Sequence, residues 1–544
     1  MPQKVSLLLL IIVTGAVFFF PFLGAVNLFD WDEINFAESA REMIASGNYT
    51  MVQINYQPFR EKPPLFFWMQ AISMHVFGIS EFAARLPNAI TGIITLLTFY
   101  CIGKKFFSDR FGIIWALCMF GSFLPHLYFK SGIIDPVFNY FVFMGIFWLM
   151  LLTSKHSLTN HSKYAALAGI FIGLATLTKG PVALLILLLC AGIYWITLRF
   201  RPFLKIKEVL IFIFFFSVTA GIWFVIDVWE NGTGFVGAFI SYQLELLTRP
   251  VAGHSGAWYY HFVVVFIGCF PMSVLALPAL FKKYSDEHPI DMRRWMLILF
   301  WVVMILFTLV KTKIIHYSSL TYFPLSFLAA IVIDDAWQYR KIISKWLLIL
   351  VAIIGGIFSL LLSAAPWLAQ HKELLVPYLN DPFALDCLGT EVHWSGYESF
   401  IGIAYLLCIL LAVSLLWNKK VKHGSVLLFG ATAVCMLIYL KAVVPKIESY
   451  SQGPAIRFYE SLQAQNVYVT PIGFKSYAHY YYFQKPPGDD PQSNSEEWLL
   501  HGKLDRPAYF VVKSTSMNRM NEYSDIRLIR KEGGFAFYVR EPTP

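Results

Sequence analysis

The sequence predicts a polytopic α-helical membrane protein with a small α/β domain at its C-terminal end, on three observations. Hydrophobic residues make up 57% of the 544 residues and charged residues 14%, against about 25% charged residues in soluble proteins, and the mean hydropathy is +0.58. Apolar runs of about 18 residues or more recur up to residue 444. From residue 445 the composition becomes that of a soluble domain. We therefore expect a transmembrane domain over residues 1–444 and an α/β domain over residues 445–544.

About thirteen apolar runs are long enough to cross a bilayer. They lie near residues 5–26, 82–103, 111–129, 133–153, 163–179, 181–199, 207–228, 258–280, 293–310, 317–335, 343–364, 397–417 and 424–444. The first run is long for the core of a signal peptide, so we expect an uncleaved helix. Nothing in the sequence resembles the internal repeat of a transporter.

Basic residues give the chain a net charge of +9, and they are scattered over the loops between the runs. This pattern is typical of charges that set membrane topology and argues against a nucleic-acid partner. The basic loops alternate, so the positive-inside rule makes them cytoplasmic. An odd number of spans then puts the N-terminus inside, and the first loop, residues 27–81, and the C-terminal domain on the outer side of the membrane. Six of the seven cysteines fall inside apolar runs, which predicts neither disulfides nor a cysteine metal site.

The first loop holds the stretch Asp30-Trp31-Asp32-Glu33, whose acids lie beside a long apolar run where charge is costly. Residues 33–46 follow with one apolar helical face and predict a helix on the membrane surface, whose N-terminal end favours negative charge. Glu61-Lys62-Pro63-Pro64 precedes a second interfacial helix over residues 65–77. A loop that only connects spans needs no such charges, so we interpret this one as the active site of a membrane enzyme.

Several cations lie on the expected outer side, against the orientation rule. They are Arg41, Arg60, Lys62, Arg85, Lys130, Lys179, Arg249, Lys311 and Lys313. An anionic ligand at the outer membrane face would explain them as a set. The alternative is that individual side chains reach toward the membrane surface or pair with nearby acids.

Two acids on this face could supply acid–base chemistry. Asp32 at a helix end can act as general base for an incoming hydroxyl or amine, and Asp135 begins a later span. Cations could hold a phosphate that leaves with developing negative charge. Both acids could instead cap their helices, and we interpret His254 and His316 as structural or interfacial rather than as ligands.

The order of these motifs resembles that of a known group of enzymes. The motifs are Asp32-Glu33-x-x-x-Ala37-Glu38-x-x-Arg41-Glu42-Met43, Glu61-Lys62-Pro63-Pro64-Leu65, Glu81-x-x-x-Arg85-Leu86-Pro87, Asp135-Pro136, Thr178-Lys179-Gly180-Pro181, Trp258-Tyr259-Tyr260 and Lys313-x-x-x-Tyr317. Together they resemble the integral-membrane GT-C glycosyltransferases, and among these the lipid A aminoarabinose transferases and the protein O-mannosyltransferase-like families. The resemblance covers the membrane part in order, whereas the C-terminal domain fits only in kind.

The resemblance implies an inverting transferase that uses a polyprenyl-phosphate sugar, such as an undecaprenyl-phosphate sugar, on the periplasmic side. Asp32 is similar to the family's first-loop catalytic acid, Asp135 to its partner, and the adjacent Glu33 joins the catalytic acids. The implied donor-phosphate contacts are Glu61, Lys62, Arg85, Lys179, Arg249, Lys313 and Tyr317. The sugar could be 4-amino-4-deoxy-L-arabinose or a hexose, and the acceptor lipid A, another glycolipid or a secreted protein.

One departure concerns a divalent metal. Many aminoarabinose transferases have a His shortly before the loop Arg, but here that stretch reads Tyr242-Gln243-Leu244-Glu245 and the nearest histidine is His254. A metal held by Asp32, Glu61 and His254 therefore stays an open alternative, and no cofactor is certain.

Two other function classes stay open beside an enzyme. A lipid or solute transporter would have internal repeats and charges near mid-membrane, and a membrane scaffold would leave the acidic loop unexplained.

In the C-terminal region we expect a helix over residues 453–465, then β-rich stretches at 466–472, 477–483 and 508–513, and a hairpin of 526–531 with 535–540 around Gly533-Gly534.

Overall fold

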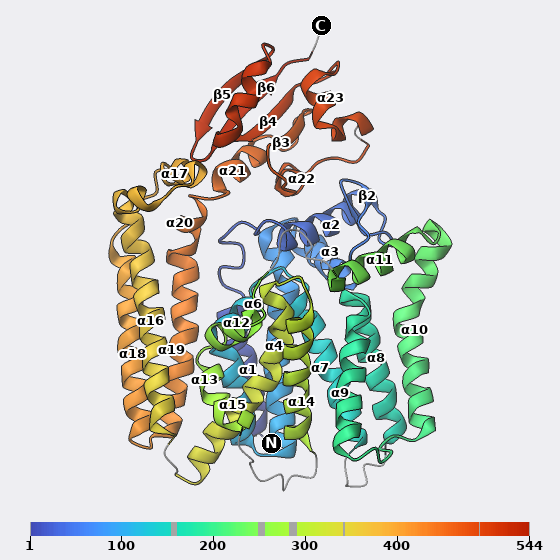
Figure 1. Ribbon diagram of the computed structural model, residues 1–544, viewed down its shortest axis with the longest axis vertical. Helices are drawn as coiled ribbons and strands as arrows, with labels where there is room; N and C mark the ends of the chain where they lie inside the picture. The colour runs from blue at the N-terminus through green and yellow to red at the C-terminus, as the bar shows by residue number, and fades with distance from the viewer. Residues whose placement is uncertain are drawn as a thin grey trace.

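The computed structural model describes residues 2–153, 160–248, 256–281, 291–340, 343–488 and 490–542. Long helices stand side by side, and a β-sheet lies beyond one end of them (Figure 1). The N-terminus lies at the opposite end of the helices from the sheet and the C-terminus, as Figure 1 shows. The chain is a multi-span membrane protein with a small sheet-containing domain at its C-terminal end, which confirms the predicted fold class.

The helices of the central group run from the N-terminus to the middle of the chain. They are α1 (Pro2–Phe19), α4 (Glu81–Phe106), α5 (Asp109–Phe120), α6 (Phe123–Tyr128), α7 (Asp135–Leu152), α12 (Tyr260–Gly268), α13 (Met272–Phe281), α14 (Met292–Leu309) and α15 (Tyr322–Gln338). Their buried side chains form the largest core, in which Phe99 stacks on Trp115 with ring centroids 4.3 Å apart. The indole N–H of Trp115 donates to Ser326, which satisfies a polar group far from water.

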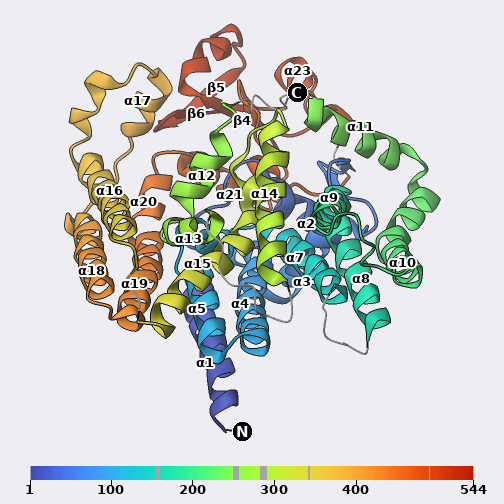
Figure 2. The ribbon, with the colours of Figure 1, turned by 60° about the horizontal axis from the view of Figure 1, so that its bottom comes forward.

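Two further groups of helices flank this centre on opposite sides (Figures 1 and 2). One holds α8 (His161–Lys179), α9 (Val182–Thr197) and α10 (Ile206–Asn231), and the other α16 (Lys345–Gln370), α18 (Phe400–Trp417) and α19 (Val421–Ala442). Large aliphatic side chains such as Val225, Leu360 and Leu407 are exposed on these groups. An apolar surface of this kind is stable when it faces lipid.

Among the described residues, eight helices are long and apolar enough to cross a membrane, or nine when the bent pair α12 and α13 counts as one span. Every one of the thirteen predicted runs contains a helix, but several helices are short. The run at 111–129 is broken between α5 and α6 at Gly121-Ser122, and the chain bends by 119° between α12 and α13. Hydropathy does not register such breaks, so the predicted count exceeds the number of full-length helices.

Three helices lie across the end of the bundle that faces the sheet (Figure 1): α2 (Asp32–Ser46), α3 (Leu65–Phe77) and α11 (Gly234–Thr248). The first two match the interfacial helices predicted from the sequence. However, α2 is buried on its polar side as well as its apolar side, because the C-terminal domain covers it. Its buried Arg41 pairs with Glu38, with Nη2 to Oε1 at 2.7 Å. The short hairpin β1 (Gln53–Ile54) and β2 (Gln57–Pro58) follows α2.

The C-terminal domain is built around a sheet with the strand order β3-β4-β6-β5. The strands are β3 (Tyr468–Ile472), β4 (Ala508–Lys513), β5 (Ile526–Glu532) and β6 (Phe535–Arg540); β3 pairs with β4 in parallel, and the other neighbours are antiparallel. Its helices are α21 (Gly453–Ser461), α22 (Ala478–Phe483) and α23 (Glu496–His501). The short helix α20 (Val444–Glu448) leads into it from α19, and α17 (Pro382–Leu388), in the loop between α16 and α18, packs against it. The predicted hairpin around Gly533-Gly534 is confirmed.

The predicted strand at 477–483 is wrong, because these residues form α22. Tyrosine and phenylalanine favour strands only where cross-strand neighbours receive them. Here Ala478, Tyr481, Tyr482 and Phe483 instead bury their side chains in a core shared with α2 and α21. Packing against the first loop therefore decides the local structure.

Candidate active site

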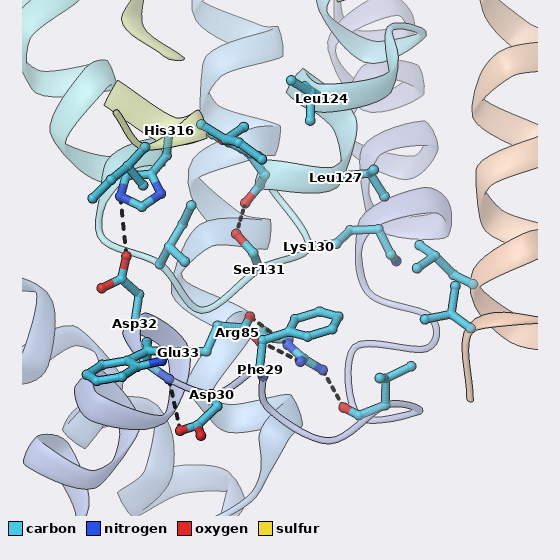
Figure 3. A pocket seen from close by; sticks show the side chains of 18 of the residues that line it. Phe29, Asp30, Asp32, Glu33, Arg85, Leu124, Leu127, Lys130, Ser131 and His316 are labelled. Carbon is cyan, nitrogen blue, oxygen red and sulfur yellow. Dashed lines mark hydrogen bonds and ion pairs between the residues drawn. The ribbon is translucent and has the colours of Figure 1, made fainter. Parts of the chain in front are cut away.

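Asp32 is the first residue of α2, directly after a strained residue. Trp31 has φ +72°, a left-handed conformation that a tryptophan rarely adopts, and strain of this kind is concentrated at functional sites. The Asp32 side chain is 42% exposed, and its Oδ2 lies 3.2 Å from His316 Nε2. Figure 3 shows the Asp32 carboxylate pointing at the His316 ring. This partly exposed acid is therefore placed by the helix end and contacted by an imidazole.

Asp135 begins α7, with Pro136 in the first turn. Its side chain is 3% exposed, and Oδ1 lies 2.5 Å from Lys179 Nζ. The other oxygen, Oδ2, accepts no hydrogen bond from any described residue and lies 3.9 Å from His316 Nε2. His316 thus stands between the two carboxylates, and a buried acceptor oxygen is left for a further partner.

Lys179 is the last residue of α8 and ends beneath the aromatic rings of Tyr317 and Phe138, 5.1 and 5.7 Å from their centroids. The next residue, Gly180, has φ +104°, and a Cβ there would lie 2.6 Å from the Phe239 ring. Only glycine fits this position, so the end of α8 is fixed there. The turn therefore fixes where the Lys179 ammonium enters the site.

Lys62 follows Glu61 in the first loop and is partly buried beside the same acids. Burial lowers the pKa of its ammonium group; Glu61 opposes this, and the nearby Lys179 adds to it. Two ammonium groups that are close enough to repel each other would both be stabilised by a doubly negative ligand.

Two cavities meet at this cluster. The smaller has a volume of about 240 Å³ and is lined by Lys62, Asp135 and Lys179. The larger, about 1240 Å³, extends between the centre and the helices α16 and α19, where its walls are apolar. Asp32, Glu61, His316 and Tyr317 line both cavities. A bound molecule in either cavity would therefore reach the same carboxylate from a different side.

Glu33 and Arg85 form an ion pair that anchors the first loop. Both side chains are buried and paired, with Nη2 to Oε2 at 2.8 Å. Arg85 also donates to the carbonyls of Leu23, Val26 and Asn27, and Figure 3 shows it lying between Glu33 and the backbone. Burial alone would raise the pKa of the Glu33 carboxyl, but Arg85 and the backbone N–H groups of Gly132 and Phe29 lower it. Both residues also line the larger cavity, but their charges already pair with each other, and their predicted roles stay untested.

Lys313 is likewise engaged by the protein itself. Its ammonium donates to the carbonyls of Phe307, Thr308 and Val310 at the end of α14, and burial lowers its pKa. Because these three bonds use all three protons, the geometry gives no support to the predicted phosphate contact. Arg249 and His254 lie outside the described residues. Within the described part of the chain, no three His, Cys, Asp or Glu side chains are grouped so that they could hold a metal ion.

His316 lies in this cluster although the sequence predicts a structural or interfacial role for it, because a lone histidine beside a span carries no pattern of its own. The one signal in the sequence is its place immediately before Tyr317, inside the motif Lys313-x-x-x-Tyr317. Chemically, the cluster can take up one proton at Asp32 or His316 and hold an anion at Lys62 and Lys179.

Comparison with known proteins agrees with this architecture. The family model described as dolichyl-phosphate-mannose-protein mannosyltransferase matches residues 61–224. The crystal structure of ArnT from Cupriavidus metallidurans bound to undecaprenyl phosphate superimposes with a TM-score of 0.75 at 18% identity, over 99% of each chain. This chain has the GT-C fold. The resemblance inferred from the motifs is thereby confirmed.

The sequence relatives of this chain include named transferases. An uncharacterized protein of Aquifex aeolicus is 28% identical over 348 residues, 63% of this chain and 77% of that protein. The undecaprenyl phosphate-alpha-4-amino-4-deoxy-L-arabinose arabinosyl transferases of Wigglesworthia glossinidia brevipalpis and Proteus mirabilis are 24% and 26% identical, over 60% and 62% of this chain. The alignments span 58% and 60% of those two enzymes, less than two thirds of their length.

Proposed function

We propose that this protein is an inverting glycosyltransferase that moves a sugar from a polyprenyl phosphate to a lipid acceptor at the membrane surface. The observation that carries the proposal is the junction of the two cavities. Asp32 and His316 lie where they meet, and the ammonium groups of Lys62 and Lys179 line the smaller one. The named relatives that use undecaprenyl-phosphate aminoarabinose support this donor class.

The smaller cavity suits the donor phosphate. The donor phosphate is a diester with one negative charge and gains a second charge as the bond to the sugar breaks, so two cations match the leaving group. The rings of Phe138 and Tyr317 leave Lys179 little contact with water. In a site shielded from water, cations stabilise a departing phosphate more strongly than they do in bulk solvent. Lys179 now pairs with Asp135, so the phosphate and Asp135 would share this cation in the complex.

The larger cavity suits the acceptor. Its apolar wall, from Leu124 and Leu127 of α6 to Phe358 of α16 and Met436 of α19, can hold acyl chains. The acceptor oxygen would attack the anomeric carbon from the side opposite the phosphate. The new carbon–oxygen bond forms as the bond to phosphate breaks, and the bonding electrons leave on the phosphate oxygen. Asp32 takes the acceptor proton, and His316 stabilises the acid and can accept the proton in turn.

Lipid A is the proposed acceptor, with 4-amino-4-deoxy-L-arabinose as the proposed sugar. The second candidate is a protein acceptor, which the match to the mannosyltransferase family favours. The apolar wall of the larger cavity favours a lipid. A transporter is less well supported, because the charged cluster lies at the end of the bundle beside α2 and not midway along the helices (Figure 1).

The basic alternate loops and the position of the N-terminus opposite the C-terminal domain support a periplasmic site in a bacterial inner membrane. We also propose residue 445 as the start of the periplasmic domain, since α20 (Val444–Glu448) leads from the last span into it.

Reconstituted transfer tests the proposal. The purified protein in lipid nanodiscs would be supplied with undecaprenyl-phosphate aminoarabinose and lipid A, and the lipids analysed by mass spectrometry. A mass gain of one aminoarabinose on lipid A is expected from the wild-type protein and not from Asp32→Asn. Transfer to a Ser/Thr-rich peptide and not to lipid A would favour the second candidate, and no transfer with either acceptor would count against the function.

A further inference from the structure

The C-terminal domain contributes side chains to the larger cavity. Lys475 and Tyr477 lie on the segment between β3 and α22, and both line the cavity together with Trp31 and Asp32 of the first loop. These residues are separated by more than 440 positions in the chain. The cavity is therefore completed only when the C-terminal domain is in place.

Lys475 lies between two aromatic rings. Its Nζ is 5.6 Å from the centroid of the Trp31 ring and 5.4 Å from that of Tyr477. The side chain is exposed, and among the described residues no carboxylate pairs with it. Cation–π contacts of this kind orient an ammonium group but leave its protons free for a hydrogen-bonding partner.

The other cations that line the larger cavity are already engaged. Arg85 is paired with Glu33, and Lys130 donates to the carbonyls of Phe18, Phe19 and Pro21 at the end of α1. Burial lowers the pKa of Lys130 to about 7, and Arg85 adds to this effect. Lys475 is thus the cation of this cavity that remains available to a ligand, within the part of the chain that the structure describes.

Trp31 ties this cation to the proposed base. It immediately precedes Asp32, is 46% exposed, and has a strained backbone at φ +72°. Its carbonyl accepts from Asn35 in the first turn of α2, and its N–H donates to Asp30. A ligand group held at Lys475 would therefore lie beside the residue that positions Asp32.

Hydrogen bonds fix the C-terminal domain on the first loop. The Leu28 N–H donates to the Tyr482 hydroxyl at 2.7 Å, and Gln452 donates to the Leu28 carbonyl at 2.8 Å. Tyr56 donates to the Lys485 carbonyl at 2.7 Å. These contacts involve residues before and after Lys475 in the sequence. They therefore fix the segment that carries Lys475 in its position beside the cavity.

We propose that Lys475, held by Trp31 and Tyr477, binds an anionic phosphate group on the headgroup of the lipid acceptor. This proposal rests on the proposed function and names a determinant of acceptor recognition. Asp30 and Asp32 face the same cavity and would repel such a headgroup, so a cation beside them is needed for it to approach. The apolar wall holds the chains while Lys475 holds the charge.

Binding without donor tests this proposal separately from transfer. The full-length protein in detergent micelles would be titrated with bis-phosphorylated lipid A, with the same lipid after removal of its phosphates, and with inorganic phosphate. Lys475→Ala is expected to weaken binding of the phosphorylated lipid about tenfold and to leave the dephosphorylated lipid unchanged. Lys475→Arg should restore most of the loss, and Tyr477→Phe, which keeps the ring, should bind like the wild type.

Lys503→Ala is the matched control, because Lys503 is an exposed lysine of the same domain that does not line the cavity. Equal binding by Lys475→Ala and Lys503→Ala, or an equal loss for both lipids, would overturn the proposal. Tight binding of inorganic phosphate alone, lost in Lys475→Ala, would also overturn it, since it would assign the site to a free anion. If phosphorylated lipid binds through Lys475 but no sugar is transferred, the proposed function fails and this site stands.

Discussion

Lys179 Nζ lies 2.5 Å from Asp135 Oδ1, where the end of α8 meets the start of α7. The Asp135 side chain is 3% exposed and that of Lys179 13%, so the pair is largely shielded from water. Both residues line the smaller cavity, and the second oxygen of Asp135 accepts no hydrogen bond from any described residue. Their charges balance each other, so removing either one leaves the other buried without its counter-charge.

This pairing predicts unequal effects of two substitutions. Lys179→Met leaves the Asp135 charge buried without its cation, which costs about 3–5 kcal/mol in folded proteins. Lys179→Met/Asp135→Asn removes both charges and is expected to regain most of that loss. Thermal unfolding of the two variants in the same detergent measures the difference, and equal melting temperatures would contradict the pairing.

Asp32→Asn should reduce transfer by a factor of about 10²–10⁴, the usual contribution of a general base, because the amide cannot accept the acceptor proton. The side chain is 42% exposed, so folding should be unaffected. Initial rates of sugar transfer and the elution profile in size-exclusion chromatography check both parts. Asp30→Asn, its neighbour two residues earlier, is the matched control and should keep most of the activity.

Lys62→Ala should weaken donor binding more than any other single substitution in the first loop. Its ammonium lines the smaller cavity beside Lys179, and one charge-assisted contact to phosphate is worth about 1.5–3 kcal/mol. Binding of undecaprenyl phosphate, measured by competition with a fluorescent analogue, should weaken about tenfold or more. Arg60→Ala removes a cation close in sequence that does not line either cavity, and an equal effect of the two variants would contradict the assignment.

The sequence predicted the helical membrane fold and the two surface helices, because each leaves a local signal, and the acids of the first loop are likewise visible in it. A charge beside an apolar run, or a proline at a helix start, is visible in a few residues. The burial and pairing of Glu33 and Arg85 could not be predicted in the same way, since in the sequence both are charged residues like Asp32. The places of His316 and Lys475 beside the first loop could not be predicted either, because they arise from contacts between segments that are far apart in the chain.

His316→Asn should lower the transfer rate while leaving donor binding unchanged. The imidazole contacts Asp32 at 3.2 Å and borders both cavities. Its loss removes a contact that positions the Asp32 carboxylate but leaves Lys62 and Lys179 in place to bind the donor phosphate. Rate and donor affinity should be measured on the same preparation. A parallel loss of both would assign His316 a structural role.

The raised pKa of Glu42 predicts how the stability of the folded protein depends on pH. Burial raises the pKa of this carboxyl from 4.5 to about 9, and Glu38 beside it adds to the rise. The folded protein therefore keeps this proton between about pH 4.5 and 9, where the unfolded chain has lost it, so stability falls as pH rises through this window.

Glu42 accepts from the backbone N–H groups of Asn55 and Tyr56, and Tyr56 contacts the C-terminal domain. Glu42→Gln keeps the shape without the titration, so its melting temperature should decline less between pH 6 and 9 than that of the wild type. Parallel curves for the two proteins would show that the proton is not held at Glu42.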